Sequence, residues 1–249
     1  DMTFQISKAL YDQLSETEKY IVDFISENEE KIPFLSITNI ADKTFSSSAT
    51  VSRTIQKCGF QGISDLRYRI SQQSDNKNTE ESPYAINKIL DQIYQEATHT
   101  IDNLQITSIL KTIEYIKSAE KIYLYARGFT VQIAEEFQMY LQLLGYHTIL
   151  VSDVQWMKQT NKIVTNKDMI FIISNRNSTR ALAESARMAR RIGTKIVVCC
   201  CKSPTELEKY SDILLLGHSE IIMKSKGLIS YSYISLMIII EIIIKYLSS

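Results

Sequence analysis

The chain has 249 residues, of which 45% are hydrophobic and 22% charged. This composition excludes a disordered chain and fits one large domain or two ordinary ones. The 28 basic and 28 acidic residues balance, so overall charge gives no reason to expect a nucleic-acid partner. Three histidines, and four cysteines without a Cys-x-x-Cys spacing, argue against a zinc site. We expect a cytoplasmic protein with reduced thiols, no metal and no cofactor.

Residues 1–73 predict an all-α domain of short helices. Residues that favour helix ends mark the boundaries: Ser15 with Glu18 as a capping box, Pro33 as a stop, Ser36 as a start, and Gly59 as a left-handed C-terminal cap. The third helix covers about residues 48–57, after a tight link. Residues 74–83 are polar apart from Pro83 and predict a linker.

The third helix has two chemically different sides. Val51, Ile55 and Cys58 share one side, which we expect to pack on the preceding helices. The opposite side suits a major groove, because arginine binds guanine edges, glutamine pairs with adenine, and hydroxyls or lysine hold phosphates. The candidate DNA contacts are Ser47, the expected N-cap, followed by Ser48, Ala49, Thr50, Ser52, Arg53, Gln56 and Lys57.

The local charge supports this interpretation. Between residues 43 and 73 the only acid is Asp65, against five basic residues: Lys43, Arg53, Lys57, Arg67 and Arg69. A basic patch of this kind can meet phosphate. The alternative is a small helical domain with an ordinary solvated polar face.

Residues 84–249 predict a second domain of α/β class. Helical patterning covers residues 84–118, and continuous apolar runs then predict strands that alternate with helices, as in a five-stranded parallel doubly wound sheet. The expected strands cover residues 121–126, 147–151, 168–173, 195–201 and 212–216. Cys199, Cys200 and Cys201 would alternate between the two faces of their strand and could not readily pair.

The last predicted element is a helix over about residues 228–247. Its segment 234–247 is strongly apolar, but Glu241 and Lys245 interrupt it, and it is shorter than the ~20 residues a bilayer requires. We expect no membrane span. This helix and the helices of residues 84–118 are the candidates for the interface of a homodimer or higher homo-oligomer, because of their apolar excess.

The N-terminal sequence resembles the RpiR-type regulators. The resemblance is carried by the segment Leu35 to Ala41, by Ser47-Ser-Ala-Thr-Val-Ser-Arg53, and by Cys58-Gly-Phe-Gln-Gly-Ile-Ser-Asp-Leu66. Their pattern there is Leu-Ala, a turn, Ser-x-Ala-Thr-Val-x-Arg and then Leu-Gly-Phe-x-Gly-Phe. The resemblance implies a helix-turn-helix domain that binds double-stranded operator DNA.

The resemblance continues more loosely over residues 107–247. It implies a sugar isomerase (SIS) domain, which in that family senses phosphorylated sugars or sugar acids and dimerises. Two loops carry it. In Ala126-Arg-Gly-Phe-Thr130, Gly128 and Thr130 fit the pattern Gly-x-Gly-x-Ser, whereas Ala126 replaces a glycine.

The second loop departs further from the family. In Ser174-Asn-Arg-Asn-Ser-Thr179 the pattern is Ser-x-Ser-Gly-x-Thr, so Arg176 replaces a serine and Asn177 a glycine. Arg176 could give a phosphate two charge-assisted hydrogen bonds or fill the pocket with its bulk. The candidate ligand-binding residues are Gly128, Thr130, Ser174, Arg176, Asn177, Ser178, Thr179 and Glu220, which follows the fifth strand.

Three functions therefore compete. The first is a DNA-binding regulator, of carbohydrate metabolism, that responds to a phosphorylated sugar or another anionic metabolite. The second is a DNA-binding regulator whose α/β domain only dimerises. The third is a sugar-phosphate isomerase, for which only Glu220 and, more weakly, His218 could serve as the base. We expect no catalytic residues.

Overall fold

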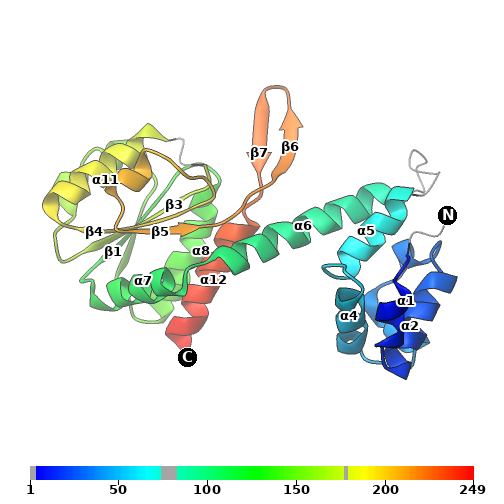
Figure 1. The fold of residues 1–249 in the computed structure, drawn as a ribbon. Coiled ribbons are helices and arrows are strands. Elements are labelled where there is room, and N and C mark those ends of the chain that lie inside the picture. The colour runs from blue at the N-terminus through cyan, green and yellow to red at the C-terminus, as the bar shows by residue number, and fades with distance from the viewer. Residues whose placement is uncertain (1–3, 74–82, 177–178) are drawn as a thin grey trace. The chain divides into compact units, whose positions relative to one another are not determined.

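The computed structural model describes residues 4–73, 83–176 and 179–249. Contacts divide the chain into two compact units, Asp1–Gln95 and Glu96–Ser249 (Figure 1). Helix α6 (Tyr84–Asn103) begins in the first unit and ends in the second. Of the predicted linker, residues 74–82 lie outside the described part of the chain.

The first unit is all-α, as predicted. Its apolar core is formed by one side of several amphipathic helices, and Ile21, Ile55 and Leu66 are fully buried in it. The elements are α1 (Lys8–Asp12), α2 (Glu16–Glu27), the 3-10 helix η1 (Ile32–Phe34), α3 (Ile37–Lys43), α4 (Ser48–Lys57), α5 (Ile63–Gln73) and the start of α6.

The predicted caps of this unit are confirmed, but the predicted stop at Pro33 is wrong: α2 ends at Glu27 with Asn28 as its C-cap, and Pro33 lies in η1. Ser15 and Glu18 form a reciprocal capping box at α2, and Ser36 caps α3 together with Asn39. Gly59 follows α4 in the left-handed conformation, at φ +89°, with its N–H donating to the Gln56 carbonyl at 3.0 Å. Local sequence thus fixes where these helices begin and end.

The second unit contains the predicted five-stranded parallel sheet. Its strand order is β2-β1-β3-β4-β5, and every neighbouring pair is parallel. The strands are β1 (Ile122–Ala126), β2 (Thr148–Val151), β3 (Met169–Ser174), β4 (Lys195–Cys200) and β5 (Ile213–Leu216). The first connection runs to one side of β1 and the later ones to the other side, so the strand order reverses between β1 and β3.

Helices cover both faces of this sheet, which explains why the strands are apolar throughout (Figure 1). One core lies against α7 (Ile106–Ser118), α8 (Thr130–Leu143) and α12 (Ile234–Ser248). The other core lies against α9 (Val154–Met157), α10 (Thr160–Ile163), α11 (Arg180–Ile192) and the 3-10 helix η2 (Leu207–Tyr210). Cys199 and Cys201 belong to the first core and Cys200 to the second, so the predicted alternation is confirmed.

The end of the chain differs from the prediction. The helix predicted from residue 228 begins only at Ile234, because an antiparallel hairpin of β6 (Ile221–Ser225) and β7 (Leu228–Tyr231) precedes it. Lys226 and Gly227 both have positive φ and form the tight turn between the strands. The apolar residues of β7 lie close before the apolar helix in sequence, so the pattern predicts a single helix over both.

The helices predicted over residues 84–118 are α6 and α7. Leu104 and Gln105 separate α6 from α7. None of the helices that the described residues form combines the length and hydrophobicity needed to cross a bilayer.

Candidate functional site

Helix α4 shows the two sides that the sequence predicts. Val51 and Ile55 are fully buried, and Thr54 is buried beside them with its hydroxyl donating to the Thr50 carbonyl at 2.9 Å. The outer side faces solvent: Ala49, Arg53, Gln56 and Lys57 are exposed, whereas Ser48, Thr50 and Ser52 are half-buried. A pre-formed helix whose polar side is free is suited to a major groove.

The N-terminus of α4 is fixed by its own side chains. Ser47 is the N-cap, as predicted, and its hydroxyl accepts the Thr50 N–H at 3.1 Å. In the preceding turn the Thr44 hydroxyl donates to the Ile40 carbonyl at 2.8 Å. Phe45 takes the left-handed conformation, at φ +51°, with its ring 90% exposed. Glycine is the usual residue for such a backbone, so this helix-turn-helix link is strained.

Three of the five predicted basic residues are engaged inside the unit. Lys57 pairs with Glu18 at 2.5 Å, and Arg69 pairs with Asp65 at 2.6 Å. Arg67 is half-buried, donates to the Leu35 carbonyl at 3.3 Å, and burial lowers the pKa of its guanidinium.

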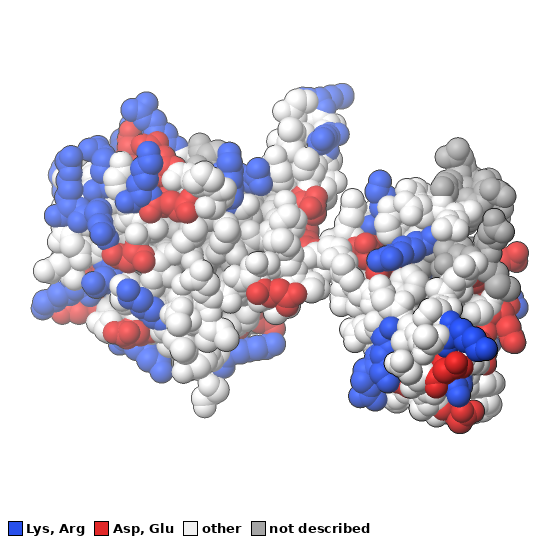
Figure 2. Space-filling view, in the orientation of Figure 1, with Lys and Arg blue, Asp and Glu red and all other residues white. Residues whose placement is uncertain are grey.

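Lys43 and Arg53 are the exposed cations that remain of this set. On the face that Figure 2 shows, basic and acidic side chains are interspersed, with uncharged areas between them. The exposed basic charge of this set is therefore confined to Lys43 and Arg53 and does not form a broad basic field.

The second candidate site lies where β1 and β3 end. These neighbouring strands lie at the point where the strand order reverses, and ligands of open α/β sheets bind in the crevice there. A cavity of about 470 Å3 occupies this position. Helix α8 starts at Thr130 after β1, and α11 starts at Arg180 after β3, so the N-termini of two helices face this end of the sheet.

The loop after β1 is held rigidly. Gly128 has φ +61°, a conformation that glycine adopts without strain. The Thr130 hydroxyl donates to the carbonyls of Arg127 at 2.9 Å and Ile173 at 3.0 Å. Gly128 and Thr130 both line the cavity, but the Thr130 hydroxyl ties the loop to β3. What the loop offers to an anion is its backbone N–H groups at the start of α8.

The loop after β3 supplies further polar groups. Ser174, Arg176 and Thr179 line the cavity. The guanidinium of Arg176 lies 4.4 Å from the ring centre of Tyr231, and this cation–π contact holds it at the wall of the cavity. Asn177 and Ser178, which the sequence also predicts here, lie outside the described residues.

The structure adds residues that the sequence did not predict. Arg127, Phe129, Asn175, Lys202, Ile229, Ser230, Tyr231 and Tyr233 also line the cavity. Lys202 follows β4 closely and could have been found as a cation at a strand end. Tyr231 could not, because the apolar pattern predicts a helix where its strand lies. Among the described lining residues none is Asp, Glu or His, so the wall is cationic and neutral.

Glu220 does not line this cavity. It lies beyond β5, half of its side chain is exposed, and it forms a 2.8 Å hydrogen bond with Nε2 of His218. The predicted base is therefore separate from the predicted phosphate loops.

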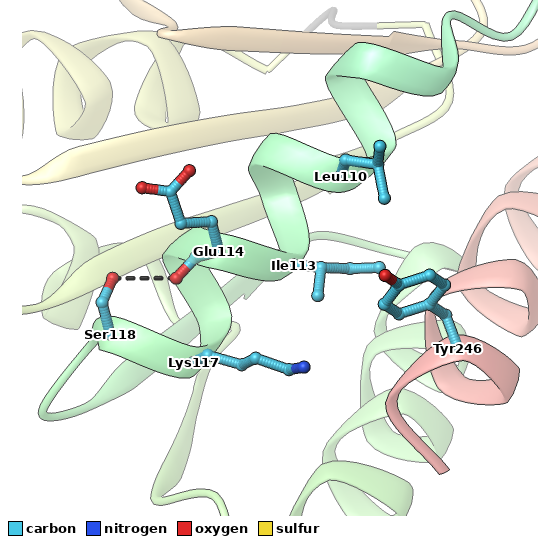
Figure 3. Close-up of a pocket in the computed structure, with 6 residues that line it drawn as sticks. All are labelled: Leu110, Ile113, Glu114, Lys117, Ser118 and Tyr246. Atoms are coloured by element: carbon cyan, nitrogen blue, oxygen red, sulfur yellow. Dashed lines mark hydrogen bonds between the residues drawn. The ribbon is translucent and has the colours of Figure 1, made fainter. Parts of the chain in front are cut away.

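A third feature lies away from the strand ends. Figure 3 shows a groove of about 380 Å3 between α7 and α12, in which Tyr246 of α12 points toward Ile113 of α7. Leu110 and Tyr246 are partly exposed there, and Nζ of Lys117 lies 5.8 Å from the Tyr246 ring centre. None of the predicted site residues lines the groove.

Comparisons with known proteins agree with both halves of the chain. Residues 2–77 match the family model described as a helix-turn-helix domain of the rpiR family, and residues 115–242 match the SIS domain model. An uncharacterized HTH-type transcriptional regulator of Clostridium perfringens is 25% identical over 209 residues, which cover 80% of this chain and 75% of that protein.

Solved structures share the fold. The NanR protein of Vibrio vulnificus, solved in complex with ManNAc-6P, superposes with a TM-score of 0.57 and 20% identity, covering 95% of this chain and 87% of that one. A phosphoheptose isomerase of Francisella tularensis superposes with a TM-score of 0.53 and 15% identity, covering 66% of this chain and 96% of that one. The fold of the second unit thus occurs in regulators and in enzymes.

Proposed function

Because the chain belongs to the rpiR family of helix-turn-helix transcriptional regulators with a SIS domain, we propose that it binds operator DNA through α4 and that a phosphorylated sugar controls this binding from the cavity at β1 and β3. The observation that carries the ligand half is the composition of that cavity. Arg127, Arg176 and Lys202 line it, no described lining residue is acidic, and two helices begin beside it.

In the DNA half, the exposed side of α4 reads the bases. Arg53 and Gln56 are the groups with bidentate capacity for guanine and adenine, and Ser47, Ser48, Thr50 and Ser52 lie where the helix start would meet phosphates. Ala49 offers a small apolar contact to a thymine methyl. Lys57 can contact phosphate only by giving up its ion pair with Glu18.

The same cavity supports a regulator more than an isomerase. Isomerisation requires a base at the sugar, and the described residues that line this cavity include neither a carboxylate nor a histidine; His99 and His218 line only the cavity beside it. Burial raises the pKa of the Tyr233 hydroxyl, so this group stays protonated and is not available as a base. The NanR neighbour, whose structure contains ManNAc-6P, supports a phosphorylated sugar as the ligand class.

The regulator acts as a homodimer in this proposal. A symmetric dimer presents two reading helices to two half-sites. The groove between α7 and α12 supports the predicted interface, because Leu110, Tyr246 and, at the start of α7, Ile106 expose apolar surface around it.

A thermal-shift titration tests the ligand half. The purified chain is titrated with N-acetylmannosamine 6-phosphate, fructose 6-phosphate and inorganic phosphate. A ligand at 100 times its Kd should stabilise the folded chain by about 2.7 kcal/mol. Arg176→Ser should weaken the response, whereas Lys226→Ser, at the hairpin turn outside the cavity, should not. Absence of any response in the wild-type chain and both variants would leave a DNA binder whose SIS domain only dimerises, and turnover of a sugar phosphate would indicate an enzyme.

Selection of binding sites from random DNA tests the reading helix. Arg53→Ala and Gln56→Ala should each lose about 1–3 kcal/mol of discrimination at one base position, as expected for a bidentate contact. Lys31→Ala removes an exposed charge from the same unit and should leave the selected sequence unchanged. If both α4 variants selected the wild-type sequence with wild-type affinity, α4 would not be the reader.

A further inference from the structure

A second cavity adjoins the first within the SIS unit. Its volume is about 450 Å3, and it shares two residues with the first cavity, Arg176 and Lys202. Its other described lining residues come from three further places in the chain: His99, Asn103, Cys201, Ser203, Leu216, Gly217 and His218. Of the candidate site residues that the sequence singles out, Arg176 and His218 lie here.

Arg176 stands between the two cavities. Its guanidinium packs 4.4 Å from the Tyr231 ring centre, and Tyr231 lines only the first cavity. A guanidinium has five N–H donors in one plane, so it can donate to oxygen atoms on more than one side. Lys202 adds a second cation that borders both cavities.

The far wall of the second cavity consists of α6 and the segment after β5. The imidazole rings of His99 and His218 pack with their centres 4.7 Å apart. The backbone N–H of His218 donates to the Thr100 hydroxyl at 3.0 Å, and the Thr100 and Ser235 hydroxyl oxygens are hydrogen-bonded at 2.6 Å. These contacts fix the last turns of α6 against the segment that carries His218.

The chemistry of this cavity favours an anion. No Asp or Glu occurs among its described lining residues, and the carboxylate beside them is that of Glu220, which is already engaged with Nε2 of His218 at 2.8 Å. Glu96, one turn before His99 on α6, is buried, and this burial raises the pKa of its carboxyl. Burial also raises the pKa of the Cys201 thiol to about 12, so this thiol carries no negative charge at neutral pH.

We propose that the second cavity is a subsite for a second anionic group of the regulatory ligand, held by Arg176 and Lys202 on one side and by His99, Asn103 and His218 on the other. This inference rests on the proposed function. The ligand class is therefore a sugar with anionic groups at both ends, and a single phosphate fills only the first cavity.

The position of this subsite also gives it a route to the DNA reader. His99 and Asn103 belong to α6, the helix that begins in the first unit and ends in the second. A ligand confined to the first cavity contacts none of the described α6 residues, because that cavity is lined from residue 127 onward. The second anionic group would thus be the part of the ligand that restrains α6.

A matched pair of probes tests the subsite. Fructose 6-phosphate and fructose 1,6-bisphosphate share one sugar and differ by one phosphoryl group. Isothermal titration of the full chain should give a Kd roughly tenfold lower for the bisphosphate, the expected scale for added charge-assisted hydrogen bonds. His99→Ala and Asn103→Ala should bring the two Kd values within about twofold of each other. Ile101→Ala, an exposed α6 residue that does not line the cavity, should keep the preference.

Hydrogen–deuterium exchange locates the effect. The bisphosphate should slow exchange at residues 96–103 more than the monophosphate does, in wild type but not in His99→Ala. Equal Kd values for the two probes in wild type, or a preference that survives both cavity variants, would overturn the subsite while leaving a one-phosphate sensor. Absence of binding by either probe would overturn the ligand half of the proposed function and the subsite with it.

Discussion

The two candidate sites of this regulator are built in opposite ways. The candidate DNA reader is one side of a single helix, Ser48–Lys57. Its N-cap is the preceding residue, and its buried side packs on helices that are near in sequence. The ligand cavity draws its walls from the ends of β1, β3 and β4 and from the base of the β6–β7 hairpin. A local site can be read from periodicity, whereas a distributed one depends on topology.

The largest expected effects test whether each site depends on its own core. Phe171→Ala removes a fully buried ring that packs edge-on against Phe137 at 5.1 Å, and it should destabilise the SIS unit by about 3–5 kcal/mol. Ile55→Ala should destabilise the reader unit by about 2–5 kcal/mol. The single tryptophan, Trp156, lies in the SIS unit, so its fluorescence during denaturation follows that unit. If Ile55→Ala moved the Trp156 transition as far as Phe171→Ala, the two cores would be one cooperative system.

The next effect concerns the wall of the second cavity. A Cβ at Gly217 would lie 2.7 Å from the Ser235 Cβ and 3.2 Å from the Cys201 Sγ, so α12 approaches the strand end closely there. Gly217→Ala should cost about 1–3 kcal/mol of stability by overpacking. Ligand affinity should fall while DNA affinity without ligand stays unchanged. Gly145→Ala is the control: this glycine is left-handed, at φ +88°, and has open space around it, so its substitution measures backbone strain without overpacking. Wild-type stability of Gly217→Ala would show that the wall is pliable.

A smaller effect, of opposite sign, is expected in the reader. Phe45→Gly should stabilise the first unit by up to about 1 kcal/mol, since it relieves left-handed strain and removes a ring that is 90% exposed. Chemical denaturation followed by helical circular dichroism measures the change. Loss of stability instead would mean that the Phe45 ring makes contacts that its exposure in this conformation does not reveal. A loss of DNA affinity without loss of stability would give this ring a role at the operator.

The smallest effect is a dependence of stability on pH. Burial raises the pKa of Glu96 in the folded chain and the charge of Glu220 adds to the shift, while Ser232, the charge of His218 and a hydrogen bond from the Glu220 backbone oppose it. The folded state therefore keeps the proton over an interval above the ordinary pKa, in which the unfolded state has released it. Stability contributed by this group falls as pH rises through that interval. Urea denaturation at several pH values should show a shallower fall in Glu96→Gln than in wild type. Identical slopes would place the source of the pH dependence elsewhere.

Much of this molecule could be predicted from local chemistry. The serine caps at Ser15, Ser36 and Ser47 and the glycine at position 59 act within one turn of the chain, so the helices they delimit appear in the structure as expected. The five strands were equally visible, because a strand covered on both faces leaves an unbroken apolar run. The hairpin was missed because its apolar residues, such as Ile229, precede an apolar helix without a polar break.

What the sequence determined by itself is therefore the helix caps of the first unit, the five parallel strands and the polar outer side of α4, since these follow from capping residues, unbroken apolar runs and the 3.6-residue period of a helix. What only the tertiary structure decided is which partner each polar side chain contacts. It engages Lys57 with Glu18, brings Arg176 onto Tyr231, and gathers His99 and His218 from segments that lie far apart in sequence. Those contacts depend on how strands and helices pack together. The apolar contacts that stabilise this packing are spread over the whole core and do not belong to any one sequence motif.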